Sequence, residues 1–177
     1  MKKIKIYLIV IGAFLILFFF IDIYIVDGES MNSTIKNNAL VVVLKYNLIS
    51  NYFFKITRND DVVFKFLDNG SDKKMILKNV FGSIGDTCII DSFLDKYKLF
   101  TIKNKQIKKY IFLNEESKIF FFNRNKYWFV SKKREEIPLN KHYFVVGTNK
   151  KTSFDSRDFG PIPVESITGK VIFYFNY

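Results

Sequence analysis

The sequence is poor in residues on which many enzymes depend, because its 177 residues include one cysteine, Cys88, and one histidine, His142. A single cysteine cannot form an intramolecular disulfide or supply a cysteine-rich zinc site, so we interpret Cys88 as a small core residue. Any Ser-His-Asp triad would have to use His142. This histidine lies in a turn that enters an apolar strand, within residues 139–147, which favours a surface or strand-edge position. A nucleophilic serine in this chain would therefore need another base.

Acidic residues are also few: 17 Asp and Glu stand against 28 Lys and Arg, which gives a net charge of +11. Such an excess attracts nucleic acid or anionic lipid. The lysines are scattered among Asn, Ile and Phe, with no arginine-rich stripe and no repeated aromatic platform. We therefore expect no nucleic-acid partner and an attraction to anionic lipid headgroups.

One apolar run of membrane length is present, at residues 6–21, and it contains no charge. Its 16 residues would form a helix about 24 Å long, which Lys5 and residues 23–26 can extend toward a hydrocarbon core of about 30 Å. We predict a retained anchor at residues 6–26, with residues 1–5 in the cytoplasm and residues 27–177 outside it. The alternative is a cleavable secretory signal, but residues 22–27 lack a small-x-small pair and are more typical of a strand.

Short β-branched and aromatic segments dominate the rest of the chain and predict a mainly β domain. About 150 residues are enough for one domain with a real core. Residues 91–140 are rich in Lys and Asn with hairpin-like alternation, so we predict an inserted β region there and a solvated turn at residues 132–136. The predicted strands are residues 39–44, 61–66, 75–80, 87–90, 119–122, 127–130, 143–146 and 169–175.

Three segments carry the candidate chemistry. Ser30 follows the predicted anchor, Lys78 lies within an apolar strand, and residues 147–163 form a loop that contains Asp155 and Arg157. A neutral lysine can activate a serine, and burial in an apolar strand would lower its pKa. Among 28 basic residues, however, spacing alone does not choose the base. Asp155 and Arg157 could pair across a tight turn, or could simply close an ordinary polar loop.

Taken in order, these segments resemble the sequence boxes of type I signal peptidases, the membrane-bound Ser-Lys proteases that remove signal peptides. Residues 28–35 (GESMNSTI) resemble the serine box, residues 77–86 (LKNVFGSIGD) the lysine box, and residues 147–160 the Gly-Asp-Asn…Ser-x-Asp-Ser-Arg box. Residues 167–170 (ITGK) fit the closing Ile-x-Gly-Lys. The chain departs from the usual pattern at Ser33, Asn79, Ile84, Thr148 and Asp158, which bears on turn rigidity and local packing more than on the reaction.

The resemblance implies a signal-peptidase-like β-sheet or barrel domain in which Ser30 is the nucleophile and Lys78 the general base. It implies that Ser153 orients Lys78, and that Asp155 and Arg157 form a buried ion pair near the site. The oxyanion would be met by the Ser30 N–H. The hydroxyl that some members carry two residues earlier is replaced here by Gly28, which can offer only main chain.

The resemblance further implies that the substrate is the signal peptide of an exported preprotein, cleaved after a small residue, with no cofactor and no metal. The peptide would bind as an added strand beside Asp27, Glu29, Met31, Ile76 and Leu77. The apolar surface around residues 20–26 would contact membrane lipid. The expected location is a bacterial-type inner (cytoplasmic) membrane, crossed once with the N-terminus inside.

Three alternatives remain at this stage. A narrower processing peptidase of a conjugative-transfer or dedicated secretion system would share the chemistry and differ in its substrates. An inactive, membrane-anchored peptide-binding β domain would keep the fold without the reaction. A self-cleaving repressor also uses a Ser-Lys dyad, but the N-terminal apolar span in place of a DNA-binding helical domain counts against it.

Overall fold

The computed structural model describes residues 7, 12, 19–46, 54–67, 73–93, 96–103, 106–113, 120–123, 126–129 and 134–177. Among these residues no helix has both the length and the apolar character needed to span a membrane. Most of the apolar run at 6–21 lies outside the described residues. The strand expected after this run is confirmed, because Ile21–Ile25 form β1. Residues 21–25 of the predicted 6–26 anchor are therefore strand rather than helix.

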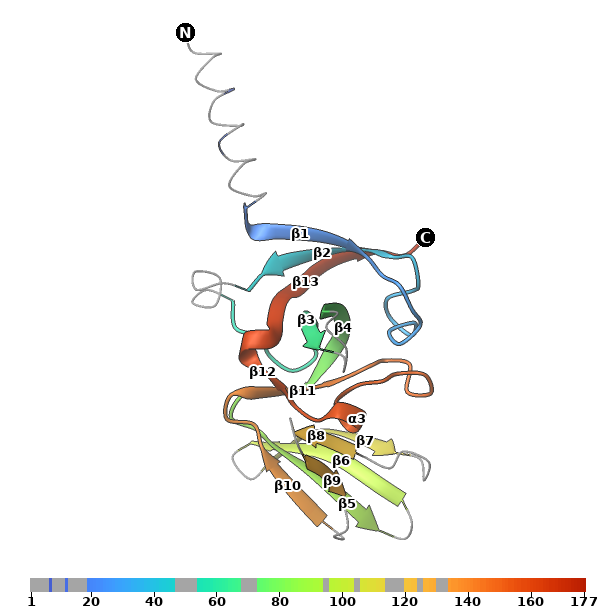
Figure 1. Ribbon diagram of the computed structural model, residues 1–177, viewed down its shortest axis with the longest axis vertical. Helices are drawn as coiled ribbons and strands as arrows, with labels where there is room; N and C mark the ends of the chain where they lie inside the picture. Colours follow the sequence, from blue (N-terminus) through green and yellow to red (C-terminus); the bar gives the residue numbers. More distant parts are fainter. Residues whose placement is uncertain are drawn as a thin grey trace.

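An antiparallel sheet of seven strands forms the body of the protein (Figure 1). The strand that comes last in the chain lies near its middle, between strands formed much earlier in the sequence. The expectation of a mainly β fold is confirmed. The order across the sheet is β1, β2 (Leu40–Lys45), β13 (Ile167–Phe175), β3 (Asp61–Leu67), β4 (Lys73–Gly82), β11 (His142–Val146) and β12 (Ile162–Pro163).

Strands within residues 87–138, which include most of the predicted insertion, form a second sheet at the end of the molecule opposite β1 (Figure 1). The solvated turn predicted at residues 132–136 is wrong from Arg134 onward, because Arg134–Pro138 form β10 and pair with β5. The charged residues at 134–136 have the composition of a turn, but pairing with β5 holds them in a strand. The sheet order is β10, β5 (Thr87–Phe93), β6 (Lys96–Lys103) and β7 (Gln106–Leu113), and β8 (Phe120–Asn123) pairs separately with β9 (Lys126–Phe129).

The apolar core occupies both faces of the seven-stranded sheet. Successive residues of β3 point to opposite faces, so Val62 and Phe64 join one buried cluster while Val63 joins the other. This two-sided burial explains why three apolar residues follow one another at Val62 to Phe64. Cys88 is buried as predicted. His142 is exposed at the start of β11.

An irregularity in β13 decides which side chains face outward at the end of the sheet. Val171 lies opposite Val43 and Phe173 lies opposite Val42, so Ile172 is an extra residue in the ladder. A one-residue insertion exchanges the two faces of a strand. Phe173 and Phe175 consequently point away from the core, where simple alternation from Val171 would have buried them.

Candidate active site

The nucleophile candidate lies on a turn between β1 and β2. Met31 and Ile35 are buried beneath this turn in one of the core clusters. The Ile35 N–H donates to the Met31 carbonyl at 2.8 Å, which gives the segment a single helical turn. Ser30 therefore sits at the edge of a locally ordered segment whose apolar residues fasten it to the core.

Lys78 reaches Ser30 from β4, with 2.7 Å between Lys78 Nζ and Ser30 Oγ. The lysine is 4% exposed. Val62, which is opposite Lys78 in the ladder, and Val80, two residues along β4, point to the same face and are fully buried. Burial in this apolar setting lowers the pKa of Lys78 to about 8 from the usual 10.5. A lysine with this pKa is neutral in about one molecule in ten at pH 7.

Three charged groups modify this pKa. Asp155 and Asp158 raise it, and Arg157 lowers it. Their net effect is smaller than that of burial, which is the largest cause of the shift. Arg157 thus partly offsets the influence of the two aspartates on the pKa of Lys78.

Asp155 is fully buried and its carboxylate accepts five hydrogen bonds. Arg157 supplies three of them, from its backbone N–H at 3.1 Å, Nε at 2.8 Å and Nη2 at 2.7 Å. The Gly147 N–H and the Ser153 hydroxyl donate the other two, at 2.8 and 2.6 Å. The buried pair expected from the sequence is thus a two-pronged ion pair that also caps the helix α3 (Ser156–Phe159).

Ser153 lies beside the dyad but its hydroxyl donates to Asp155, while the hydrogen bond of Lys78 runs to Ser30. Ser153 can lie this close to the Ser30 main chain because residue 147 is a glycine. A Cβ atom built on Gly147 would lie 2.0 Å from Ser153 Oγ and 2.6 Å from the Ser30 carbonyl oxygen. Only glycine allows the chain to pass between these two serines, so Gly147 brings the third segment against the first.

The residues expected to bind the peptide differ in how far their side chains are exposed to solvent. Asp27 and Glu29 are exposed near Ser30, and Ile76 and Leu77 precede Lys78 and pack against opposite core clusters. Met31, by contrast, is 1% exposed. Its side chain is enclosed by the core, so only its main chain is left for the expected contact with a peptide.

Main-chain donors near Ser30 differ in their availability. No described residue accepts a hydrogen bond from the Ser30 N–H. The Gly28 N–H donates to the Asn37 side chain at 2.8 Å, and Gly28 has a φ of +111°, a conformation that favours glycine. Gly28 thus shapes the approach to Ser30, and its own amide is already engaged.

Most of the sequence departures have partners in the structure. Ser33 donates to the Thr148 carbonyl at 3.1 Å, and Thr148 lies within 3.3 Å of the Thr34 hydroxyl. Asn79 donates to Asp61 at 2.8 Å. Asp158 completes a capping box by accepting the Asp155 N–H at 2.9 Å. Hydrogen bonds, some of them between distant segments, therefore hold the side chains at these four departures from the usual pattern.

Asparagine contacts to the Ser30 turn were not anticipated from the sequence. The Asn149 backbone N–H donates to the Ser30 carbonyl at 2.9 Å, and its side chain donates to the Glu29 carbonyl at 3.1 Å. Bonds from side chains to distant main chain leave no spacing pattern, so no sequence signal marks them. Among the described residues no three Asp, Glu, His or Cys side chains gather into a group that could hold a metal ion.

Comparison with known proteins places the chain in a family. The family model described as "Signal peptidase, peptidase S26" matches residues 1–176. The chain belongs to this signal peptidase family. Peptidase S26 members are serine peptidases. The resemblance drawn from the three sequence boxes is confirmed.

Individual relatives agree with the family assignment. The chain is 36% identical over 157 residues to "Signal peptidase I V" of Bacillus subtilis, covering 86% of this chain and 83% of that protein. It is 31% identical over 175 residues to "Signal peptidase IB" of Staphylococcus aureus, covering 92% and 84%. A solved signal peptidase I from Enterococcus faecalis has 20% identity and covers 66% of this chain and 97% of its own, with a TM-score of 0.36. The assignment rests on the sequence matches.

Proposed function

We propose that this protein is a membrane-anchored serine endopeptidase that cleaves signal peptides from exported preproteins after a small residue, with Ser30 as nucleophile and Lys78 as general base. The observation that carries the proposal is the 2.7 Å contact between Lys78 Nζ and Ser30 Oγ, combined with a lysine pKa lowered to about 8. Membership of the signal peptidase family supports the substrate class.

In the proposed reaction neutral Lys78 accepts the Ser30 hydroxyl proton as Ser30 Oγ attacks the scissile carbonyl. The Ser30 N–H is placed to stabilise the oxyanion. Lys78 then delivers the proton to the leaving amine, and a water activated by the same lysine releases the acyl group. Ser153, already donating to Asp155, keeps lone pairs on its oxygen that can accept from the Lys78 ammonium and hold it in place.

An open strand edge supports binding of an extended peptide. β11 pairs with β4 only from Asn79 to Gly82, so on that side residues 75–78 have no strand partner among those described. An extended peptide can add to such an edge through main-chain hydrogen bonds. This edge ends at Lys78, so a peptide bound there would run toward the dyad.

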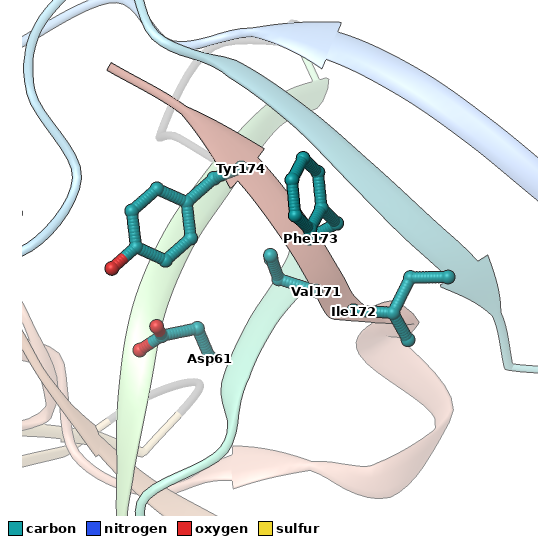
Figure 2. Close-up of a pocket in the computed structure, with 5 residues that line it drawn as sticks. All are labelled: Asp61, Val171, Ile172, Phe173 and Tyr174. Carbon is teal, nitrogen blue, oxygen red and sulfur yellow. The ribbon is translucent and has the colours of Figure 1, made fainter.

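An exposed apolar grid on β1, β2 and β13 supports contact with lipid. The ladder places Ile23, Val42 and Phe173 in one row, and Ile25, Leu40 and Phe175 in the next. The four outer side chains of these rows are 51 to 72% exposed, and no charged residue interrupts either row. Figure 2 shows Phe173 and Ile172 on β13 at the edge of this grid, beside a hollow lined also by Asp61, Val171 and Tyr174. A contiguous exposed apolar face marks an interaction surface.

The proposed reaction is tested by cleavage of a preprotein with an Ala-x-Ala site in liposomes. The wild type should cut after the small residue, and Ser30→Ala should reduce the rate to background. The wild-type rate should rise with pH through about 8, because deprotonation of Lys78 generates the base. Wild-type protein that binds the preprotein without cutting it would favour the inactive peptide-binding domain, and cleavage of only one dedicated substrate would favour the narrower processing peptidase.

Lipid contact is tested with a tryptophan at the grid. The chain has one tryptophan, Trp128, which is first replaced by phenylalanine. In liposomes whose acyl chains carry bromine, the fluorescence of a Phe173→Trp variant should be quenched. An Ile84→Trp variant is the matched control, since Ile84 is also exposed but lies on a turn outside the grid. Equal quenching at the two positions would contradict the assignment of this face to lipid.

A further inference from the structure

The outer side of the Ser30 turn is held by hydrogen bonds rather than by packing into the core. Within residues 28–37, called here the nucleophile turn, Met31 and Ile35 anchor the inner side to the core. Asn32 and Thr34 are exposed on the outer side. Catalysis requires the nucleophile to be held within a fraction of an ångström of its base, so the hydrogen bonds on the outer side of the turn matter for its alignment.

Asn176 supplies a contact on this outer side. Its Nδ2 donates to the Thr34 carbonyl at 3.0 Å, and its Oδ1 accepts the Lys36 N–H at 2.9 Å. One side-chain amide thus pairs with a carbonyl and an N–H two residues apart, as the main chain of a neighbouring strand would. The contact joins parts of the chain that are 142 residues apart in sequence.

The support behind Asn176 is rigid. Asn176 directly follows β13, whose Phe175 lies opposite Leu40 on β2. β13 is flanked by β2 and β3 within the sheet, and β3 is in turn paired with β4, which carries Lys78. The nucleophile turn and the base are therefore both tied to one set of paired strands, and Asn176 is a link between the turn and that set.

We propose that Asn176 is a positioning residue that holds the nucleophile turn so that Ser30 Oγ stays within reach of Lys78. The inference rests on the proposed peptidase function for its kinetic consequence. Asn176 acts on main-chain atoms of the turn and touches neither the reacting atoms nor Lys78. Its loss lowers the fraction of molecules in which the dyad is aligned, and leaves the peptide-binding edge of β4 unchanged.

The kinetic test compares Asn176→Ala with a Tyr177→Ala control, because Tyr177 is adjacent and 86% exposed. Asn176→Ala should lower kcat about ten- to hundredfold with KM within about twofold, while Tyr177→Ala should cleave like the wild type. Asn176→Asp keeps the acceptor for the Lys36 N–H but cannot donate to the Thr34 carbonyl. Its kcat should therefore fall between that of Asn176→Ala and that of the wild type. A wild-type kcat for Asn176→Ala, or a change confined to KM, would overturn the proposal.

Amide hydrogen exchange gives a readout that does not depend on cleavage. In Asn176→Ala, exchange should accelerate at the Lys36 N–H and also at the Asn149 N–H, which donates to the Ser30 carbonyl. Acceleration at Lys36 alone would show that the contact is local and would overturn the positioning role. If the wild type fails to cleave any preprotein, the proposed function fails, and the exchange result still decides whether Asn176 holds the turn.

Discussion

An Arg157→Met variant should lose about 3 to 5 kcal/mol of its free energy of unfolding. Arg157 donates three of the five hydrogen bonds that the buried Asp155 carboxylate accepts. Methionine keeps the backbone donor but removes both guanidinium bonds and the compensating charge, so a carboxylate remains buried without a cation. Urea unfolding of the two proteins in the same detergent measures the difference.

Two further variants separate charge from geometry in this prediction. Arg157→Lys keeps the charge and loses the two-pronged contact, so its loss should be smaller. Combining Arg157→Met with Asp155→Asn removes both charges and should recover part of the stability. The cleavage rate of Arg157→Met should also rise at a higher pH than that of the wild type, because Arg157 lowers the pKa of Lys78. A loss below about 1 kcal/mol for Arg157→Met would show that Asp155 is not desolvated as the structure indicates.

A Lys78→Met variant should be inactive yet more stable than the wild type, by on the order of 3 kcal/mol at pH 7. The folded pKa of Lys78 is about 8 and the ordinary value is 10.5, so at pH 7 the folded protein bears the cost of a buried ammonium. Methionine has a similar length and no charge. Thermal or urea unfolding across pH measures the gain.

The pH dependence distinguishes this cause from better packing. Below about pH 8 Lys78 is charged in both folded and unfolded chains, so the gain from Lys78→Met should be at its full value. Between about 8 and 10.5 the folded lysine is neutral while the unfolded one is still charged, so wild-type stability rises and the gain should shrink. A gain that stays constant over this range would contradict burial of the charge as its source.

The sequence predicted local features of this protein well. Periodic β-branched segments gave β2, β3, β4, β5, β11 and β13 with small errors at their ends. The three segments that carry Ser30, Lys78 and Asp155 were found because, taken in order, they resemble the sequence boxes of type I signal peptidases. Arg157 could be paired with Asp155 because a two-residue separation in a tight turn brings such side chains together.

Contacts between distant segments could not be predicted in the same way. The Asn149 and Asn176 side chains bind main-chain atoms of the Ser30 turn, and main chain has no residue identity for a pattern to detect. The side chain of Phe173 points outward because β13 has one extra residue in its pairing with β2. The register of that pairing could not be predicted from the sequence. β10 was missed because Arg134 and Glu135 have the composition of a turn and are held in a strand by β5.

The place of β13 in the sheet also sets an order of events during synthesis. Residues 167–175 are made after every other strand that the structure describes, yet they lie between β2 and β3. Until they emerge from the ribosome, β2, which follows Ser30, and β3, which pairs with the strand of Lys78, lack the strand that hydrogen-bonds to both of them. A nascent chain of this protein therefore contains both Ser30 and Lys78 long before β13 completes the sheet, and we expect the proposed peptidase activity to begin only after β13 is inserted.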